Sequence, residues 1–170
     1  MRLFPSFAES MGVFTFNSCV SRLLQVSLGS RSTVCGGYQG TSALYFNGGG
    51  TRQVVTPVLS MLAGGSVSFY HRLGAGGYGS CENVDGGEGV VLEAQWSDAV
   101  GGVRVSWAPL FSSNTNLAYY KTMRFVSVSI PAGGWPGVQL RWRQLSHSGS
   151  GYDSWMVDNV VIGGETGALW

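Results

Sequence analysis

The chain has 170 residues, enough for one domain with a real hydrophobic core. Charged residues make up only 11% of it and the formal net charge is +1, which excludes the basic field that attracts nucleic acid. Apolar residues reach 44%, so the chain is expected to fold rather than to be disordered. No apolar run approaches the ~20 residues of a membrane helix, so no membrane insertion is expected.

Short alternating segments separated by glycine-rich turns run through the chain. The expected strands are residues 11–16, 23–28, 42–47, 52–56, 66–73, 90–96, 103–107, 125–130, 138–143 and 155–162. Alternation is strict in several of them: Val103, Val105 and Trp107 lie opposite Arg104 and Ser106. No window of about 11 residues shows a helical period. The pattern predicts an all-β sandwich of two packed antiparallel sheets.

The last expected strand is apolar on both faces, which indicates a central position between packed layers. Asp158 interrupts it, on the same face as Met156, Val160 and Ile162. An unpaired carboxylate there would cost free energy, so Asp158 is expected to have a partner, either an arginine or a hard metal ion. The candidate arginines are Arg52, Arg141 and Arg143.

Oxygen donors that suit calcium are also present. The acidic and amide side chains that could contribute are Asn47, Glu82, Asp85, Glu88, Asp153 and Asp158. We predict a structural calcium ion where the loop after Phe46 meets the last strand, with Asp158 and Asn47 as ligands. Glu82 and Asp85 are predicted to complete the shell. Backbone carbonyls of residues 47–50 would add further oxygens, because glycine allows close approach.

Three patterns that resemble catalytic motifs are weak. Residues 74–79 match G-x-G-x-x-G, but no helix is expected after them. Residues 146–153 contain serines, a histidine and an aspartate without the nucleophile elbow. Glu88 and Glu93, the pair that a glycan hydrolase would need, point to opposite faces of a regular strand. We therefore predict no catalytic residues and no enzyme activity.

Aromatic side chains could form a platform for sugar rings. Four tryptophans fall in expected strands and are predicted to lie in the core: Trp96, Trp107, Trp142 and Trp155. Trp135, Tyr119 and Tyr120 fall in loops and are the better candidates for a platform.

The order and spacing of several blocks resemble the subrepeats of reelin. The blocks are Cys35–Gly36, Ala43–Gly48, Arg52–Gln53, Val67–Gly74, Ser80–Glu82, Gly87–Glu93, Leu140–Gln144 and Trp155–Val160. The resemblance implies a jelly-roll β-sandwich in an extracellular protein, secreted or at the cell surface, with a structural calcium. We expect an N-terminal segment over residues 1–34 that can supply the first strands, the module over 35–163 and a tail over 164–170.

The chain contains three cysteines, so at least one thiol is free or pairs with another chain. Reelin subrepeats usually carry a cysteine shortly after the Leu-Gly found here at residues 73–74, and it pairs with the equivalent of Cys81. That position is near Ala75 in this chain, so the local bridge is missing. We predict a disulfide between Cys19 and Cys35, with Cys81 free or joined to another chain.

Three functions are consistent with these residues. The first is a non-catalytic extracellular module that contacts partner proteins or assembly subunits and is stabilised by calcium. The second is a carbohydrate-binding module of the same architecture, with a glycan as its partner. The third is a glycan hydrolase that uses Glu88 or Glu93. The first is the predicted function.

Overall fold

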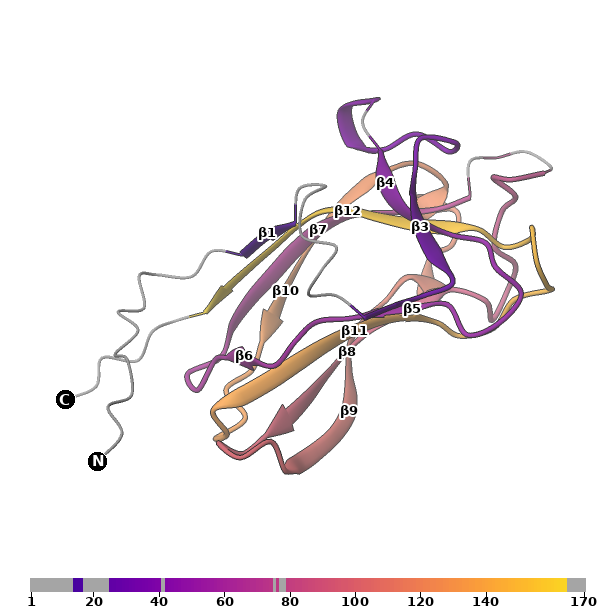
Figure 1. The fold of residues 1–170 in the computed structure, drawn as a ribbon. Helices are drawn as coiled ribbons and strands as arrows, with labels where there is room; N and C mark the ends of the chain where they lie inside the picture. The colour runs from indigo at the N-terminus through magenta and orange to yellow at the C-terminus, as the bar shows by residue number, and fades with distance from the viewer. Residues whose placement is uncertain (1–13, 17–24, 41, 75, 77–78, 165–170) are drawn as a thin grey trace, which may run out of the picture.

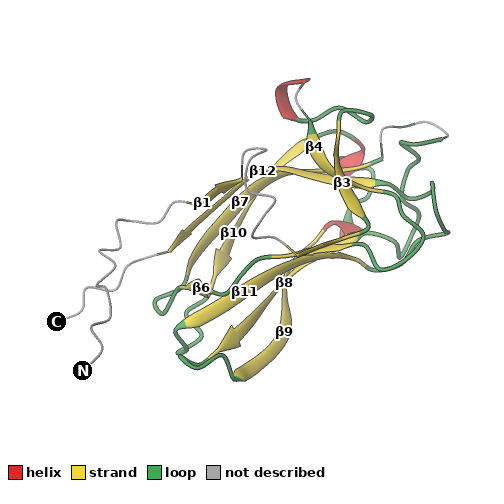
Figure 2. Cartoon of the chain, in the orientation of Figure 1, coloured by secondary structure: helices red, strands yellow, loops and turns green. Residues whose placement is uncertain are grey.

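The computed structural model describes residues 14–16, 25–40, 42–74, 76 and 79–164, which form a sandwich of two antiparallel sheets (Figure 1). The only helical elements in this part of the chain are three short 3-10 turns (Figure 2), η1 (Tyr38–Gly40), η2 (Ser113–Thr115) and η3 (Tyr119–Lys121). The predicted all-β jelly-roll sandwich is confirmed. No helix among the described residues is long and apolar enough to cross a membrane.

Within the described residues, each sheet has six strands. The first sheet has the order β10 (Arg124–Ile130), β7 (Gly65–Leu73), β12 (Trp155–Gly164), β4 (Ala43–Phe46) and β3 (Gly29–Ser32), with β1 (Phe14–Phe16) also paired to β12. The second has the order β2 (Gln25–Ser27), β5 (Gln53–Val55), β11 (Gly137–Gln144), β8 (Val90–Ser97) and β9 (Val103–Ser112), with β6 (Leu59–Ser60) also paired to β11. β3 and β6 were not expected from the sequence, because neither shows an alternating apolar pattern.

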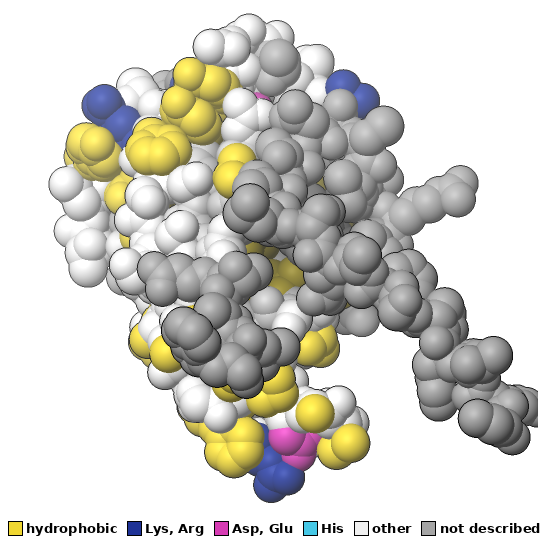
Figure 3. All heavy atoms as spheres, turned by 90° about the vertical axis from the view of Figure 1, so that its left-hand side faces the viewer, with side chains coloured by type: hydrophobic (Ala, Val, Ile, Leu, Met, Phe, Trp, Pro, Cys, Tyr) yellow, Lys and Arg dark blue, Asp and Glu magenta, His cyan; other side chains and the backbone are white. Residues whose placement is uncertain are grey.

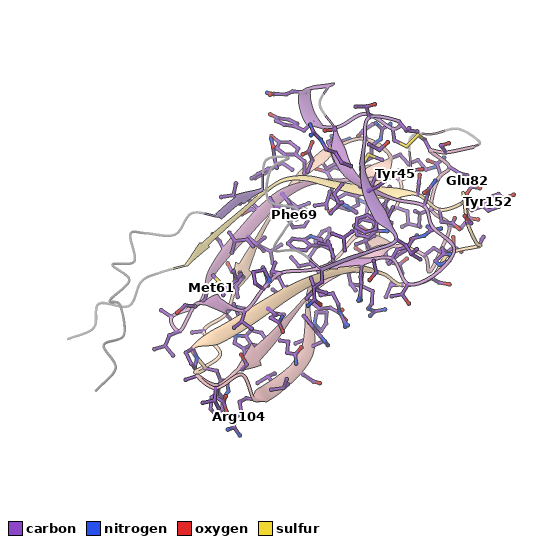
Figure 4. All side chains as sticks on the ribbon, in the orientation of Figure 1. Tyr45, Met61, Phe69, Glu82, Arg104 and Tyr152 are labelled. Carbon is purple, nitrogen blue, oxygen red and sulfur yellow. A yellow bond between two sulfur atoms is a disulfide. The ribbon has the colours of Figure 1, made fainter. Side chains whose placement is uncertain are left out.

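The core lies between the sheets and follows the alternation of the strands. Phe69 from β7 points into this space (Figure 4) and meets Trp142 of β11 edge-on, with the ring centroids 5.4 Å apart. Trp155 of β12 stacks on Phe46 of β4 at 3.9 Å. Trp96 is buried with them, so three of the four tryptophans predicted for the core lie there. The fourth, Trp107, is half-buried on the outer face of the second sheet.

The face assigned to Asp158 from simple alternation is wrong, because β12 is irregular. Its register with β7 shifts between Asp158 and Val161, and Asn159 adopts a positive φ of 46°. After this bulge, Val160 and Ile162 face the core, whereas Asp158 lies half-buried on the outer side of the first sheet. A single extra residue therefore reverses which side chains of β12 face the core, and the carboxylate of Asp158 lies outside the main core.

Candidate functional site

A buried arginine organises one end of the sandwich. Arg52 is only 1% exposed and precedes β5. Its guanidinium donates to the carbonyl of Gly48 at 2.6 Å, to that of Gly149 at 2.6 Å and to that of Asp153 at 2.7 Å. It also donates to the side-chain oxygen of Gln144 at 2.9 Å. One cation thus joins the loop before β5 to the loop between β11 and β12.

Three carboxylates surround this arginine network. Asp153 is 1% exposed, and its backbone N–H donates to Glu82 Oε2 at 2.8 Å. Its own carboxylate accepts the backbone N–H of Ser148, whose hydroxyl donates to Glu88 Oε1 at 3.1 Å. Burial and a side-chain hydrogen bond with Asp153 raise the pKa of Glu88 above its ordinary value. This cluster has no local signal in the sequence, since every partner of the Arg52 side chain except Gly48 lies 92 or more residues away.

The four predicted calcium ligands do not form one set. Asp158 accepts the backbone N–H of Tyr38 at 2.9 Å and that of Asn159 at 2.8 Å. The backbone carbonyl of Asn47 accepts an N–H from the β11–β12 loop, and Asp85 lies in an exposed turn. Of the four, only Glu82 belongs to the cluster around Arg52, at the right-hand end in Figure 4.

The described residues contain no group of three or more His, Cys, Asp or Glu side chains arranged to hold a metal ion. The carbonyl of Gly48, expected to face calcium, accepts a hydrogen bond from Arg52 instead. Arg52 was one of the candidate arginines for Asp158, but its acceptors are the loop carbonyls and Gln144. Calcium binding by this chain stays a prediction.

The disulfide joins Cys35 to Cys81, so the predicted Cys19–Cys35 pair is wrong. Their Cα atoms are 5.6 Å apart across a sequence separation of 46 residues. The loop after β7 can return over the sheet because Gly74, with a φ of +59°, lies against the backbone of Glu82 in a space too small for a Cβ atom. Cys19 lies outside the described residues.

The disulfide belongs to a second, smaller core on the outer face of the first sheet, which we name the outer core. Its members are Cys35, Ala43, Tyr45 and Met156, with Cys81 and Met123 packed against them. The guanidinium of Arg72 in β7 donates a hydrogen bond to the carbonyl of Cys35 at 3.0 Å, which also holds the segment around Cys35 on the sheet. The segment from Cys35 to η1 is thereby fixed onto the sheet.

Beside the outer core, three neighbouring aromatic rings form a row that we name the aromatic strip: Tyr38, Tyr70 and Phe125. The rings of Tyr38 and Tyr70 stack at 3.6 Å, and Phe125 follows at 5.4 Å. A side-chain hydrogen bond with Tyr38 raises the pKa of Tyr70. Phe125 is 58% exposed. The strip was missed in the sequence because Tyr38 comes from a turn far from the strands that carry the other two rings.

Of the three loop aromatics predicted as a sugar platform, two pack against the core and one is exposed. Tyr120 packs half-buried against Phe111 of the core, and Trp135 also packs against the core. Tyr119 is 44% exposed, with the Arg124 guanidinium 4.3 Å from its ring centroid. Of the three, Tyr119 alone presents an exposed ring.

The acids considered for glycan hydrolysis lie in separate networks. Glu93 sits on the outer face of β8, with Arg141 at 2.7 Å and Arg143 at 3.1 Å. Burial would raise the pKa of Glu93, but hydrogen bonds from the two arginines outweigh it and hold the pKa below its ordinary value. Glu88 belongs to the cluster around Arg52. The structure does not bring the two carboxylates together as an acid–nucleophile pair.

Two solved structures with a similar fold are domains that bind carbohydrate. A xylan-binding domain (CBM22-1) from Paenibacillus barcinonensis matches with a TM-score of 0.59 and 10% identity, covering 92% of this chain and 97% of that one. A C-terminal family 22 carbohydrate-binding module from Clostridium thermocellum matches with a TM-score of 0.53 and 10% identity, covering 96% and 100%. At this identity the similarity concerns the fold alone.

The sequence comparison is more specific. The family model of Reelin subrepeat B matches residues 29–163. This range begins at β3 and ends within β12. The match includes the strands of both sheets except β1 and β2, together with the outer core and the cluster around Arg52. The chain belongs to the reelin subrepeat B family.

Proposed function

We propose that this protein is a non-catalytic extracellular module that assembles through contacts with a second copy of the same fold. The observation that carries this proposal is a group of exposed aliphatic side chains at one end of the sandwich, which we name the aliphatic end. Its members are Val58, Leu62, Val100, Val103 and Val105. Exposed apolar side chains that gather at one end of a domain mark interaction sites.

The aliphatic end is built from neighbouring strands. Val100 lies in the turn between β8 and β9 and is 92% exposed, and Val103 at the start of β9 is 58% exposed. Val58 lies against Gly137 of β11, and Gly137 pairs with Ser97, the last residue of β8. Val58 is therefore near the end of β8, just before the turn that carries Val100. Figure 3 shows hydrophobic side chains gathered with a few charged ones at the lower end of that view.

The charges at this end neutralise one another. Arg104 forms an ion pair with Asp98, whose carboxylate also accepts N–H groups of the β8–β9 turn. An apolar surface with a neutral polar rim can meet its own copy without repulsion between like charges. The chemistry therefore suits a contact between two copies.

The extracellular location and the absence of catalysis are supported by other features. Disulfides such as Cys35–Cys81 persist in oxidising compartments. Of the two acids considered for hydrolysis, Glu93 is held by two arginines and Glu88 accepts the backbone N–H of Asp85, which suits a binding or structural role.

Sedimentation velocity over a concentration series tests the assembly. We expect the parent to self-associate and the double variant Val103→Asp/Val105→Asp to remain monomeric. Leu145→Asp, at an exposed position outside the aliphatic end, is the matched control and should behave as the parent. A parent that stays monomeric at every concentration, or a control that dissociates equally, would overturn the proposal.

Glycan binding is a second candidate function, and the aromatic strip favours it. The faces of sugar rings carry C–H groups that pack on aromatic rings, while their hydroxyls need polar partners nearby. Phe125 and Tyr70 provide the rings, and serines continue along the same strands. A glycan array probed with the parent and with Phe125→Ala tests this function; loss of the signals in the variant would support it.

A further inference from the structure

The first sheet ends in a strand whose outer edge is open. β10 is a terminal strand of that sheet, and β7 is its one partner among the described strands (Figure 1). The pairing runs without a register shift from Arg124 to Ile130. Apart from it, no described residue forms a hydrogen bond with the backbone of β10. The backbone N–H and C=O groups on the other edge of β10 are therefore available to a further strand.

The other three terminal strands of the two sheets are each protected against such pairing. β2 and β3 have only three and four residues, and β3 also carries the exposed Arg31. β9 is long, but three register shifts interrupt its pairing with β8, and Pro109 lacks an N–H group. Short strands, charges, bulges and proline are the usual protection of sheet edges. β10 has no bulge, and from Phe125 to Ile130 it has neither proline nor charge.

The core beside this edge is incompletely covered. Most of the partly buried side chains that pack on the main core come from β9, β10 and the segment between them: Ala108, Leu110, Phe111, Leu117, Tyr120 and Val128. β9 and β10 contact each other, so these side chains lie along one side of the sandwich. Val128 faces the core and is still half-buried. A strand added to β10 would therefore bury apolar surface as well as pair its backbone.

Positive charge lies at one end of the open edge. Arg124 is the first residue of β10, and the exposed Lys121 lies in η3 just before it. Neither side chain forms an ion pair with a carboxylate of the described residues. The Arg124 guanidinium lies 4.3 Å from the centroid of the Tyr119 ring and donates to the Tyr119 carbonyl at 3.0 Å. A strand that pairs antiparallel with β10 has its C-terminal end beside these two cations.

We infer that β10 docks an extended segment of a partner protein, which joins the first sheet as an antiparallel strand. The segment carries apolar residues opposite Val126, Val128 and Ile130, small polar residues between them, and an acidic residue opposite Arg124. Opposite residues of an antiparallel pair project from the same face of the sheet, so the acidic side chain lies on the side of Arg124. The contact uses a different surface from the aliphatic end and does not depend on self-association.

Fluorescence anisotropy with labelled synthetic peptides tests the site. The probe is Val-Ser-Val-Ser-Val-Ser-Glu, and a second peptide ends in Lys instead of Glu. The parent should bind the first peptide about tenfold more tightly, because Lys replaces attraction to the two cations by repulsion. The same probe with every backbone nitrogen methylated cannot donate to β10 and should not bind.

Three variants locate the site on the chain. Val128→Thr, which keeps the shape of the side chain but adds a hydroxyl, should weaken binding of both peptides about fivefold. Arg124→Gln should lower the preference for the Glu peptide about threefold. Arg31→Gln, in the terminal strand β3 of the same sheet, is the matched control and should behave as the parent.

Each contrary result removes a defined part of the inference. Undiminished binding of the methylated peptide would overturn strand pairing. Equal affinity of the parent for the Glu and Lys peptides, or an equal loss of preference in Arg31→Gln and Arg124→Gln, would overturn the acidic end of the partner segment. Absence of binding to both peptides would overturn the docking site as a whole.

Discussion

The carboxylate of Asp158 accepts the backbone N–H of Tyr38, 120 residues earlier in the chain, at 2.9 Å. This hydrogen bond fixes the turn that carries Tyr38 to the last strand of the first sheet. Together with the disulfide and with Arg72, it sets the position from which the Tyr38 ring reaches Tyr70. The acid that interrupts an apolar strand thus fixes the loop above that strand.

Replacing Asp158 by alanine should loosen this turn. Removal of the acceptor leaves the Tyr38 N–H without that partner, which costs roughly 1–3 kcal/mol for a buried group. Hydrogen exchange of the Tyr38 amide should accelerate, and Asp158→Asn, which keeps one acceptor oxygen, should lose less protection. Unchanged exchange in the alanine variant would contradict the role given to this hydrogen bond.

Calcium is tested with the same position. If Asp158 is a ligand, calcium should raise the melting temperature of the parent after treatment with a chelator, and Asp158→Asn should abolish the rise. An unchanged rise in Asp158→Asn together with its loss in Glu82→Gln would move the ion to the cluster around Arg52. A parent indifferent to calcium would indicate that arginine and backbone contacts alone neutralise these acids.

The Cys35–Cys81 disulfide should contribute a large part of the stability. It closes a loop with a sequence separation of 46 residues, for which chain entropy predicts up to about 4 kcal/mol. Urea unfolding of Cys35→Ser and Cys81→Ser should show similar losses. Cys19→Ser is the control, since the pairing found here does not use that residue. If Cys19→Ser lost as much, the pairing would be different in solution.

Stability should fall in mild acid because of His71. This side chain is fully buried, its Nδ1–H donates to the carbonyl of Met156, and burial lowers its pKa to about 4. Below pH ~6.5 the unfolded chain takes up a proton that the folded chain refuses until about pH 4. The free energy of unfolding should therefore drop by roughly 3 kcal/mol across this window. Urea titrations of His71→Gln at several pH values should show a flatter profile in the same window.

Arg52 should be among the least replaceable residues. In Arg52→Met, the carbonyls of Gly48, Gly149 and Asp153 lose a charged donor in a buried site, and breaking such a network costs about 3–5 kcal/mol. Arg52→Lys keeps the charge but cannot reach all of the acceptors, so it should lie between the parent and the methionine variant. Equal stability of all three proteins by urea unfolding would contradict the structural role of the network.

The sequence was sufficient for the sandwich and for most of its strands, because alternation is a local property. Val126, Val128 and Ile130 face inward in β10 as their spacing predicts. Alternation was insufficient where an extra residue interrupts a strand. At Asn159 a bulge shifts the register, so that Asp158 lies on the outer face while Val160 faces the core. The partners of Arg52, Cys35 and Tyr38 could not be predicted, since they depend on how loops cross each other in space.

The position of β12 has a consequence for synthesis of the chain on the ribosome. In the first sheet, β12 is the last of the described strands in chain order, and it lies between the pair β3–β4 and the pair β7–β10. Until residues 155–164 leave the ribosome, each pair exposes an open edge and an apolar face. Completion of the sheet must therefore wait until residues 155–164 are available, and a chain truncated before Trp155 would be prone to aggregation through these edges.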